Sequence, residues 1–383
     1  MLEDFIPPYD AFVIERVNEN NIPVLGKLNM DEFGMGCSTE ISYFKDTLNP
    51  HDLERVPGGG SAAAVAASEA IFALGSDTSD SIRQPASYCG IVGMKPTYGL
   101  VSRLGLAVYA SSFSQIGPLT KDVTDCANVL SLIAGHDEND TTSLNVEIPD
   151  YGASLVKDVK GLRIGVPQEL LGDDVDEEVR KSIYNAIELY RSLGAEVDEF
   201  SFPLMKYALP TLYIMACAEA SSNLGRYDGI RFGHRAANYS DLTDLYKKSR
   251  SEGFGLEVQR RLMLGTYFLT TGHYEEYYEK AQKSRTLFRN AYDETFKKYD
   301  LVLTPTTPET AFKFGEKPEG SSGICCASAS LAGLPAISIP CGSDKNGLPI
   351  GLQLIGNALS EKTILRAAYT FEQEANIKFE VKL

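Results

Sequence analysis

Short apolar runs rich in β-branched residues alternate along the chain with longer segments in which apolar residues recur every three to four positions. The first pattern is typical of buried strands and the second of helices packed on one face. Such an alternation favours an α/β fold in which helices cover both faces of a sheet. The predicted strands are 22–25, 162–166, 196–200, 301–303, 336–339 and 351–355, and the predicted helices are 62–74, 123–134, 177–193, 256–270 and 274–298.

The middle of the chain is the most helical part. Residues 206–298 carry helical patterns and no predicted strand, which indicates a helical insertion of about this extent at one edge of the sheet. No change in composition separates this stretch from its flanks, so we expect a single domain over residues 1–383. The polar segment 316–323 is rich in Gly, Ser and Pro and predicts a loop.

The composition is that of an ordinary globular protein, with 43% hydrophobic and 23% charged residues. The formal net charge of −16 argues against direct binding of nucleic acid, because phosphate contacts need Lys and Arg, although a basic partner can supply them. The seven cysteines form no Cys-x-x-Cys pair, so we expect no metal site and reduced thiols, as in the cytoplasm. Neither a signal peptide nor a membrane span is predicted.

Two loops of small residues are the strongest chemical signal. One, residues 56–61, runs through three glycines to Ser61, and the other, residues 75–81, ends in Ser81. Small residues let the backbone approach a ligand, as it must where N–H groups surround an oxyanion. None of the four histidines lies in a triad setting and no G-x-S-x-G elbow is present. Activation of Ser81 would then need a relay through another hydroxyl, such as that of Ser61, to a neutral lysine. A plain turn is the alternative.

Further motifs accompany these loops. They are Gly26-Lys27-Leu28-Asn29-Met30-Asp31-Glu32-Phe33, Asp52-Leu53-Glu54-Arg55-Val56-Pro57-Gly58-Gly59, Ser81-Ile82-Arg83-Gln84-Pro85-Ala86, Gly93-Met94-Lys95-Pro96-Thr97-Tyr98-Gly99, Glu219-Ala220-Ser221-Ser222-Asn223, Arg226-Tyr227-Asp228-Gly229, Arg260-Arg261 and Leu331-Ala332-Gly333-Leu334-Pro335-Ala336. Over nearly its whole length the chain resembles the amidase signature family, and within it the A subunits of glutamyl-tRNA(Gln) amidotransferases. The resemblance implies the amidase-signature fold, a large mixed β-sheet between helices, which agrees with the alternation described above.

The resemblance also implies an amide-hydrolysing site built on a serine nucleophile, a bridging serine and a lysine base. Ser81 falls on the nucleophile, and Thr78, Ser79, Asp80 and Ser81 fall on the loop whose N–H groups form the oxyanion hole. Arg261 falls on an arginine that holds the α-carboxylate of glutamine, a role that suits the guanidinium fork. Without the resemblance, Arg261 would be interpreted as a surface charge on a helix. No metal and no cofactor are implied for this chain.

The implied reaction releases ammonia from glutamine through an acyl-Ser81 ester. The implied partners are the B and C subunits of a heterotrimer. A channel passes the ammonia to a partner chain, which uses ATP and Mg²⁺ to convert Glu-tRNA(Gln) to Gln-tRNA(Gln). We therefore expect tRNA to bind mainly to the partner, no membrane association, and a cytoplasmic complex, or an organellar one in a eukaryote.

At the site itself the sequence departs from the family pattern. The family's lysine base lies in a Lys-Asp-Asn element before the segment that opens this chain, so we expect the base to be absent and the domain to be incomplete at its N-terminus. The Gly-Ser loop is shorter and lacks the bridging serine, and Ser61 matches the last serine of that motif. The segment 320–330 is shortened, and the family aspartate that holds the glutamine amino group has no counterpart, Gly323 being nearest.

Ser79 and Asp80 stand where the family has two glycines. If either position needs a positive φ, its side chain is strained. Asp80 also brings a carboxylate to the place where negative charge must develop. At about 4 Å and an effective dielectric near 20, like charges repel by roughly 4 kcal/mol, or roughly a thousandfold in rate. The sequence as written therefore predicts very low glutaminase activity.

Three functions stay open at this point. The first is a glutamine-hydrolysing subunit that supplies ammonia for tRNA-dependent amidation. The second is an inactive scaffold that binds the tRNA-handling partner, and the third is a free-standing amidase. An incomplete sequence and a true loss of catalysis would each explain the missing lysine and bridging serine, but neither truncation nor a shortened loop explains the substitution at Asp80.

Overall fold

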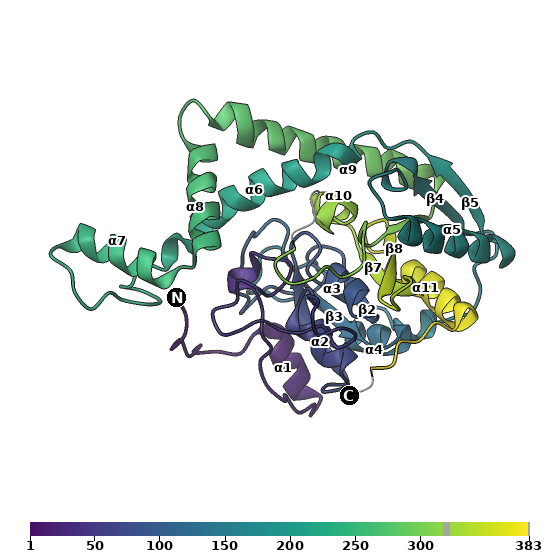
Figure 1. The fold of residues 1–383 in the computed structure, drawn as a ribbon, viewed down its shortest axis with the longest axis horizontal. Coiled ribbons are helices and arrows are strands. Elements are labelled where there is room, and N and C mark those ends of the chain that lie inside the picture. The colour runs from purple at the N-terminus through teal and green to yellow at the C-terminus, as the bar shows by residue number, and fades with distance from the viewer. Residues whose placement is uncertain (317–321, 382–383) are drawn as a thin grey trace.

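A computed structural model describes residues 1–316 and 322–381 of the chain (Figure 1). Within these residues eight strands form one sheet, in the order β1-β3-β2-β7-β8-β6-β4-β5. Strand β4 pairs in parallel with both β5 and β6, and the remaining neighbours pair antiparallel. The expected α/β fold with a large mixed sheet is therefore confirmed.

The strands are β1 Phe72–Asp77, β2 Val92–Lys95, β3 Gln115–Thr120, β4 Arg163–Pro167, β5 Glu196–Phe200, β6 Leu301–Pro305, β7 Ala336–Ser343 and β8 Pro349–Gly356. Five of the six predicted strands are confirmed as β4 to β8. The strand predicted at 22–25 is wrong: these residues pair with no strand, Pro23 lacks an N–H, and Val24 and Leu25 are 54% and 77% exposed. Strands β1 to β3 were not predicted, because glycine, serine and proline interrupt their apolar pattern.

The α-helices are α1 Phe12–Glu19, α2 Gly60–Ala66, α3 Arg83–Tyr88, α4 Val123–Ile133, α5 Glu177–Ser192, α6 Ala208–Asn223, α7 Leu242–Gly253, α8 Leu256–Leu269, α9 Lys280–Lys298, α10 Ala327–Ala332 and α11 Glu361–Ala375. The helices predicted at 123–134, 177–193 and 256–270 are α4, α5 and α8. The helix predicted at 274–298 is α9, preceded by a π-helical segment, η6 Tyr274–Glu279. The helix predicted at 62–74 is wrong in its second half, because the chain turns at Ser68 (φ 60°) and enters β1.

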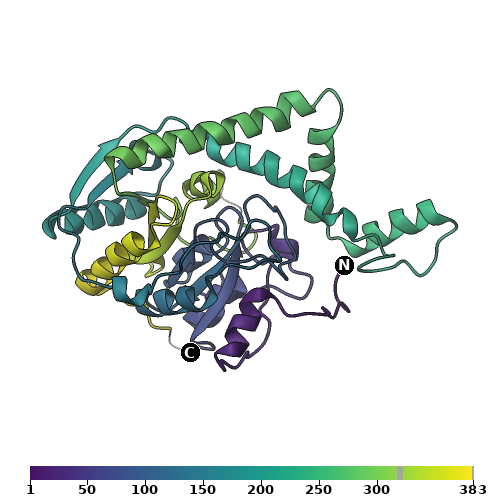
Figure 2. The same ribbon diagram turned by 180° about the vertical axis from the view of Figure 1, so that it is seen from behind.

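Helices cover both faces of the sheet (Figures 1 and 2). On one face α4, α5 and α11 enclose the largest apolar core, to which β4, β7 and β8 contribute. On the other face α2 and α3 pack against the sheet over a smaller core. A third core lies under α6, α8, α9 and α10. The loop predicted at 316–323 falls largely on residues outside the described part of the chain.

The helices α6 to α9 lie between β5 and β6 in the chain and form an arc that ends in the projecting helix α7 (Figures 1 and 2). The N-terminus lies beside α7, where the N–H of His234 donates to the carbonyl of Met1 at 2.8 Å. Helices α6 and α8 pack so closely that a Cβ added to Gly265 would lie 1.9 Å from the carbonyl oxygen of Cys217. This close approach fixes where α8 lies relative to α6.

We expect Gly265→Ala to separate α6 from α8 and to lower the free energy of unfolding by about 1–3 kcal/mol, the usual cost of overpacking a close contact. Chemical denaturation followed by circular dichroism measures this loss. Gly225→Ala is the matched control, since nothing lies within 4 Å of a Cβ added there. Equal stability of the two variants would contradict the tight crossing.

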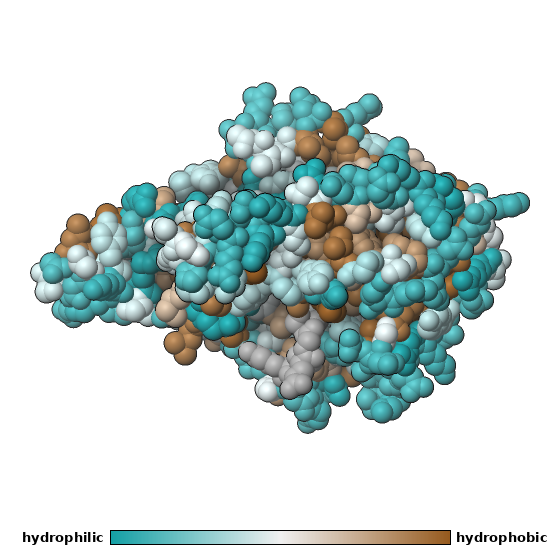
Figure 3. Space-filling model, turned by 90° about the horizontal axis from the view of Figure 1, so that it is seen from above, coloured by the Kyte–Doolittle hydropathy of each residue, from teal (hydrophilic) through white to brown (hydrophobic). Residues whose placement is uncertain are grey.

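The surface is predominantly polar on the face shown in Figure 3, where hydrophobic residues gather in separate patches. Across residues 1–316 and 322–381, no helix combines the length and the apolar character needed to cross a bilayer.

Candidate active site

Ser81 lies in the connection between β1 and α3, which we call the Ser81 loop (residues 78–82). Strand β1 ends at Asp77, whose carboxylate accepts from the N–H of Ile82, the residue before α3, at 3.2 Å. The Ser81 side chain is partly exposed, and its hydroxyl makes no hydrogen bond with any described residue. The fold therefore presents this serine at a helix start without engaging its oxygen.

The guanidinium of Arg83 holds the Ser81 loop in place through hydrogen bonds from the protein interior. It is fully buried and forms a bidentate ion pair with Asp77, with both N–O distances 3.0 Å. It also donates to the side chain of Gln353 at 2.7 Å and to the carbonyl of Ser79 at 2.6 Å. Four elements of the fold thus meet on one side chain, because α10 also contributes a bond, from Arg83 to Ser330.

Two N–H groups of the Ser81 loop point away from the hydrogen bonds that hold the loop in place. The carbonyl of Ser79 accepts from Arg83 and from the hydroxyl of Ser330, and the carbonyl of Asp80 accepts from the N–H of Gln84. In a planar trans peptide the following N–H points opposite to the carbonyl. The N–H groups of Asp80 and Ser81 therefore point away from these bonds, and no N–H of residues 78–81 donates to a described atom.

Neither Ser79 nor Asp80 has a positive φ, so the backbone strain considered for these positions does not arise. The Asp80 side chain turns inward and is only 4% exposed. One of its oxygens accepts from the hydroxyl of Ser79 at 2.6 Å, and the other lies 2.9 Å from where a Cβ on Gly323 would be. Burial raises the pKa of Asp80 to about 6, against the opposing hydrogen bond from Ser79, so the carboxyl is ionised above that pH.

Arg261 lies on α8 with its side chain only 16% exposed. Its Nε donates to Glu257 at 2.8 Å and its Nη1 to the hydroxyl of Tyr109 at 3.0 Å. The guanidinium carbon lies 5.7 Å from the ring centre of Tyr109 and 5.5 Å from that of Tyr213. Although burial opposes it, these neighbours raise the pKa of Arg261, and no described residue accepts from Nη2. The Nη2 edge of the Arg261 guanidinium is thus available to a ligand.

Asp80 and Arg261 both lie near the same stretch of helix α6. Leu209 lies 3.5 Å from the position of a Cβ on Gly323, the same position that the Asp80 carboxylate approaches. Tyr213, one helical turn further along α6, packs against Arg261. A turn of α-helix rises about 5.4 Å, so the carboxylate and the guanidinium lie at neighbouring levels of this helix. The positive charge of Arg261 lowers the pKa of Asp80, in agreement with that placement.

Ser61 is engaged elsewhere. It lies in the first turn of α2, and its hydroxyl donates to the carbonyl of Leu74 in β1 at 3.0 Å. The glycine loop before it packs tightly on α3: Gly58 has a φ of 81°, and a Cβ there would lie 2.9 Å from Cα of Pro85. No contact between Ser61 and Ser81 is present among the described residues, so the structure gives the relay no support.

Sequence reasoning missed several residues of the site. It quoted Arg83 within a motif but gave it no role, and Tyr109 and Glu257 were not singled out. Thr78 bonds Ser114 through their hydroxyls at 2.8 Å, which ties the Ser81 loop to the segment that also carries Tyr109. An arginine two residues after the candidate nucleophile was the available signal for Arg83, and its burial is seen only in the structure. Glu257 stands four residues before Arg261 on the same predicted helix, a spacing that marks an ion pair, whereas Tyr109 lies far away in sequence and no local pattern marks it.

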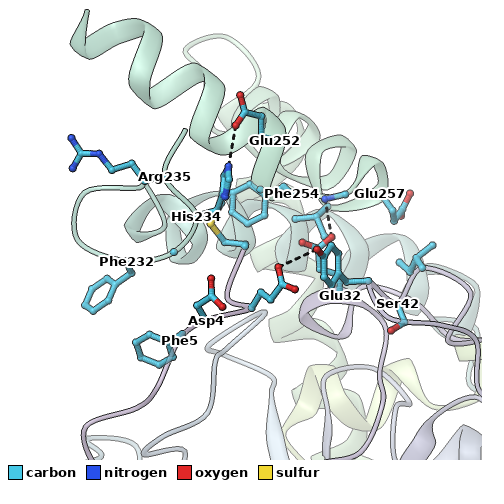
Figure 4. A pocket seen from close by; sticks show the side chains of 18 of the residues that line it. Asp4, Phe5, Glu32, Ser42, Phe232, His234, Arg235, Glu252, Phe254 and Glu257 are labelled. Atoms are coloured by element: carbon cyan, nitrogen blue, oxygen red, sulfur yellow. Dashed lines mark hydrogen bonds and ion pairs between the residues drawn. The ribbon is translucent and has the colours of Figure 1, made fainter. Parts of the chain in front are cut away.

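Two cavities are lined by neither Ser81 nor Arg261, although the larger reaches Glu257, the partner of Arg261. The larger, about 1080 Å³, is bounded by the N-terminal segment and by the residues around α7 and the start of α8 (Figure 4). Its side chains include Glu257 and an ion pair of His234 with Glu252 at 3.0 Å. The smaller, about 530 Å³, lies beside α1 and α4. Ser81 and Arg261 line neither cavity, and the described residues hold no cluster of three or more His, Cys, Asp or Glu suited to a metal ion.

The fold and the Ser81 loop together define the class of this protein: a mixed α/β sheet covered by helices, with a partly exposed serine just before helix α3. A protein-family model described as Amidase matches residues 1–365. The chain belongs to this amidase family.

Individual relatives narrow the comparison. The chain is 58% identical over 390 aligned residues to the A subunit of the glutamyl-tRNA(Gln) amidotransferase of Caldanaerobacter subterraneus, covering 100% of this chain and 79% of that one. The crystal structure of the Thermotoga maritima protein of the same name is 43% identical, with a TM-score of 0.85, and covers 100% and 81%. The native peptide amidase of Stenotrophomonas maltophilia is 30% identical, with a TM-score of 0.82, and covers 98% and 79%.

Proposed function

We propose that this protein is the glutamine-hydrolysing A subunit of a glutamyl-tRNA(Gln) amidotransferase. The Ser81 oxygen attacks the side-chain amide carbon of glutamine, the hydroxyl proton passes to the amide nitrogen, and the N–H groups of Asp80 and Ser81 hold the resulting oxyanion. Ammonia leaves as the C–N bond breaks, and water then hydrolyses the γ-glutamyl ester to glutamate. Thr78 and Ser79 complete the oxyanion loop in this proposal, and Arg261 holds the α-carboxylate.

The observation that carries the proposal is the geometry of the Ser81 loop. The serine hydroxyl and the adjacent N–H groups have no described partner, while the carbonyls on the other side of the same peptides are firmly bonded to Arg83, Ser330 and Gln84. Donors that are fixed and left free stabilise a developing charge without reorganisation. The high identity over the whole chain to A subunits of glutamyl-tRNA(Gln) amidotransferases supports glutamine as the substrate.

The names of the same relatives support an assembly with further subunits. We assign the B and C subunits as the partners in a heterotrimer, with ATP and Mg²⁺ used by the partner that amidates the tRNA-bound glutamate. This chain itself then needs no cofactor, and its net charge of −16 agrees with tRNA contacts made mainly by the partner. We also propose that residues 206–298 are a helical insertion within a single domain. The proposed compartment is the cytoplasm.

The proposed role of Arg261 predicts a binding defect. Arg261→Lys keeps the positive charge but loses the guanidinium fork, which can bond Glu257, Tyr109 and a substrate carboxylate at the same time. We therefore expect the KM for glutamine to rise about 10–100-fold, with a smaller change in kcat. Steady-state ammonia release measures both constants. Arg260→Lys is the matched control, because its side chain is 55% exposed and, among the described residues, bonds only Glu257. A KM shift shared by both variants would speak against the assignment.

The proposed function is tested with the protein as its gene encodes it, assembled with the B and C subunits. Ammonia release from glutamine and formation of Gln-tRNA(Gln) are measured in parallel. We expect both activities, with glutamine replaceable by ammonium chloride in the second. A complex that amidates tRNA only with added ammonium would overturn glutamine hydrolysis by this protein. Ammonia release from unrelated amides without partners would indicate the free-standing amidase instead.

An inactive scaffold is the second candidate, and two observations favour it. Among the described residues no side chain contacts the Ser81 hydroxyl to take its proton. The Asp80 carboxyl is buried next to the proposed oxyanion hole and is ionised at neutral pH. The experiment above separates the candidates, because a scaffold supports the assembly and the ammonium-dependent reaction only.

A further inference from the structure

The larger of the two cavities, about 1080 Å³, lies beside the projecting helix α7 (Figure 4). Its walls come from three stretches that are far apart in the chain, within residues 1–8, 32–43 and 231–258. Pockets for small ligands usually enclose about 300–1,000 Å³, so this cavity also has room for several side chains of a bound polypeptide.

Large apolar side chains gather around this cavity in exposed positions. Ile6 and Leu256 are 86% and 85% exposed, and Phe5, Tyr43 and Phe232 are each more than 40% exposed. The rings of Phe5 and Phe232 meet edge to face at 6.3 Å, one from the N-terminal segment and the other from the loop before α7 (Figure 4). Apolar side chains that are exposed together around a hollow usually mark a place where another molecule binds.

The walls of the cavity carry more negative than positive side chains. The arginines and the histidine that line it are Arg231, His234 and Arg235. Two of them are already engaged, Arg231 with Asp228 at 3.2 Å and His234 with Glu252 at 3.0 Å. The carboxylates that line it are Glu3, Asp4, Glu32, Glu252 and Glu257. The cavity therefore favours a positively charged ligand.

Three of these carboxylates lack a counter-charge from any described side chain. Glu3 and Asp4 are exposed, and neither forms an ion pair with a described residue. Glu32 accepts from the N–H of Gly255 at 2.8 Å. Burial still raises the pKa of Glu32, against opposing contributions from the N–H of Gly255 and from the amino group of Met1. A lysine or arginine brought in by a ligand would supply the missing charge.

We propose that this cavity is the docking site for another subunit of the amidotransferase, which inserts a segment bearing a lysine or arginine beside a large apolar side chain. The existence of that partner rests on the proposed function. A metal ion or a small polar cation would leave the apolar side chains exposed, and a purely apolar segment would leave the carboxylates unpaired. Nucleic acid does not fit, because its phosphates would meet carboxylates.

The proposed docking site lies next to the candidate active site without being part of it. Glu257 lines the cavity and accepts from Nε of Arg261 at 2.8 Å. A docked segment would therefore lie one side chain away from the cation proposed to hold the substrate. For this reason Glu257 is left unchanged in the test.

The test measures the dissociation constant between this protein, as its gene encodes it, and the B and C subunits by biolayer interferometry. One variant combines Glu3→Lys with Asp4→Lys, and the other combines Phe232→Ser with Leu256→Ser. We expect each variant to raise the dissociation constant about 10–100-fold, as for changes at the centre of an interface. The charge variant should also depend less on added salt than the unmodified protein does, because salt screens the pairing that it has lost.

Matched controls are Asp173→Lys with Asp174→Lys for charge and Ile71→Ser for apolar exposure, since these residues are exposed and do not line the cavity. Dissociation constants within about threefold of the unmodified value in both cavity variants would overturn the docking site and leave glutamine hydrolysis intact. Equal weakening by the controls would overturn it too, as would normal subunit assembly with a loss of tRNA binding alone.

Assembly and chemistry are measured separately, so the two proposals can fail separately. If the cavity variants weaken assembly but the unmodified complex releases no ammonia from glutamine, the proposed hydrolysis fails and the docking site stands. If the unmodified protein forms no complex with the B and C subunits, the docking site falls, whatever its activity on glutamine.

Discussion

Ser81→Ala is expected to reduce ammonia release from glutamine by about 10⁴-fold or more, the usual result of removing a serine nucleophile. The reason is chemical, since without the oxygen no acyl ester forms. The side chain has no hydrogen-bond partner among the described residues, so its removal should leave folding and assembly unchanged. Ammonia release, complex formation and amidation of tRNA with ammonium chloride are measured on the same preparation.

Ser61→Ala is the matched comparison for this variant. Its hydroxyl bonds the carbonyl of Leu74, so the substitution should cost about 0.5–1.5 kcal/mol in stability and little activity. A loss as large as that of Ser81→Ala would restore Ser61 as the relay. Normal glutamine hydrolysis by Ser81→Ala would remove the nucleophile assignment altogether.

Arg83→Met is expected to lower the free energy of unfolding by about 3–5 kcal/mol, because it leaves the Asp77 carboxylate buried without its cation. Both side chains of the pair are fully buried. The carbonyl of Ser79 would also lose its shortest bond, so the Ser81 loop should become mobile and ammonia release should fall in the folded fraction. Denaturant unfolding and ammonia release measure the two effects.

The exposed pair of Arg163 and Asp300 provides the control. It is also bidentate, but its side chains are 43% and 33% exposed, so Arg163→Met should cost about 0–1 kcal/mol. The double variant Asp77→Asn with Arg83→Met should recover part of the lost stability, since the unpaired charge is gone. Equal costs at the buried and the exposed pair would contradict the organising role of Arg83.

The fold was largely predictable from local patterns, and the failures have specific causes. Strands β4 and β6 to β8 are largely apolar and were identified, as was β5, in which Val197 and Phe200 are the apolar residues, whereas the apolar run of β1 ends at Gly75 and Ser76. A Cβ at Gly75 would lie 2.8 Å from a methyl group of Leu119 in β3, so a larger residue here requires that side chain to shift. A local pattern cannot reveal that requirement. The helix predicted at 62–74 was extended too far because the local pattern does not show where the chain leaves α2 and enters β1.

The residues of the candidate site also divide into those that could be predicted from the sequence and those that could not. Resemblance located Ser81 and Arg261, because each stands in a recognisable motif. The partners that give them their properties could not be located: Tyr109 reaches Arg261 from another part of the chain, and Gly323 approaches Asp80 across the fold. The expected strain at Ser79 and Asp80 did not arise, because their φ values are not positive.

The amino-acid sequence alone determined the alternation of strands and helices, the family, and the placement of a serine after a loop of small residues, since each depends on residues close together in the chain. Only the tertiary structure decided that the Asp80 side chain is buried and that the N–H groups of Asp80 and Ser81 point away from the bonds made by Arg83, Ser330 and Gln84. The physical reason is that Arg83 binds Asp77, Ser79, Ser330 and Gln353 at once, and these residues meet only when β1, α10 and β8 are assembled.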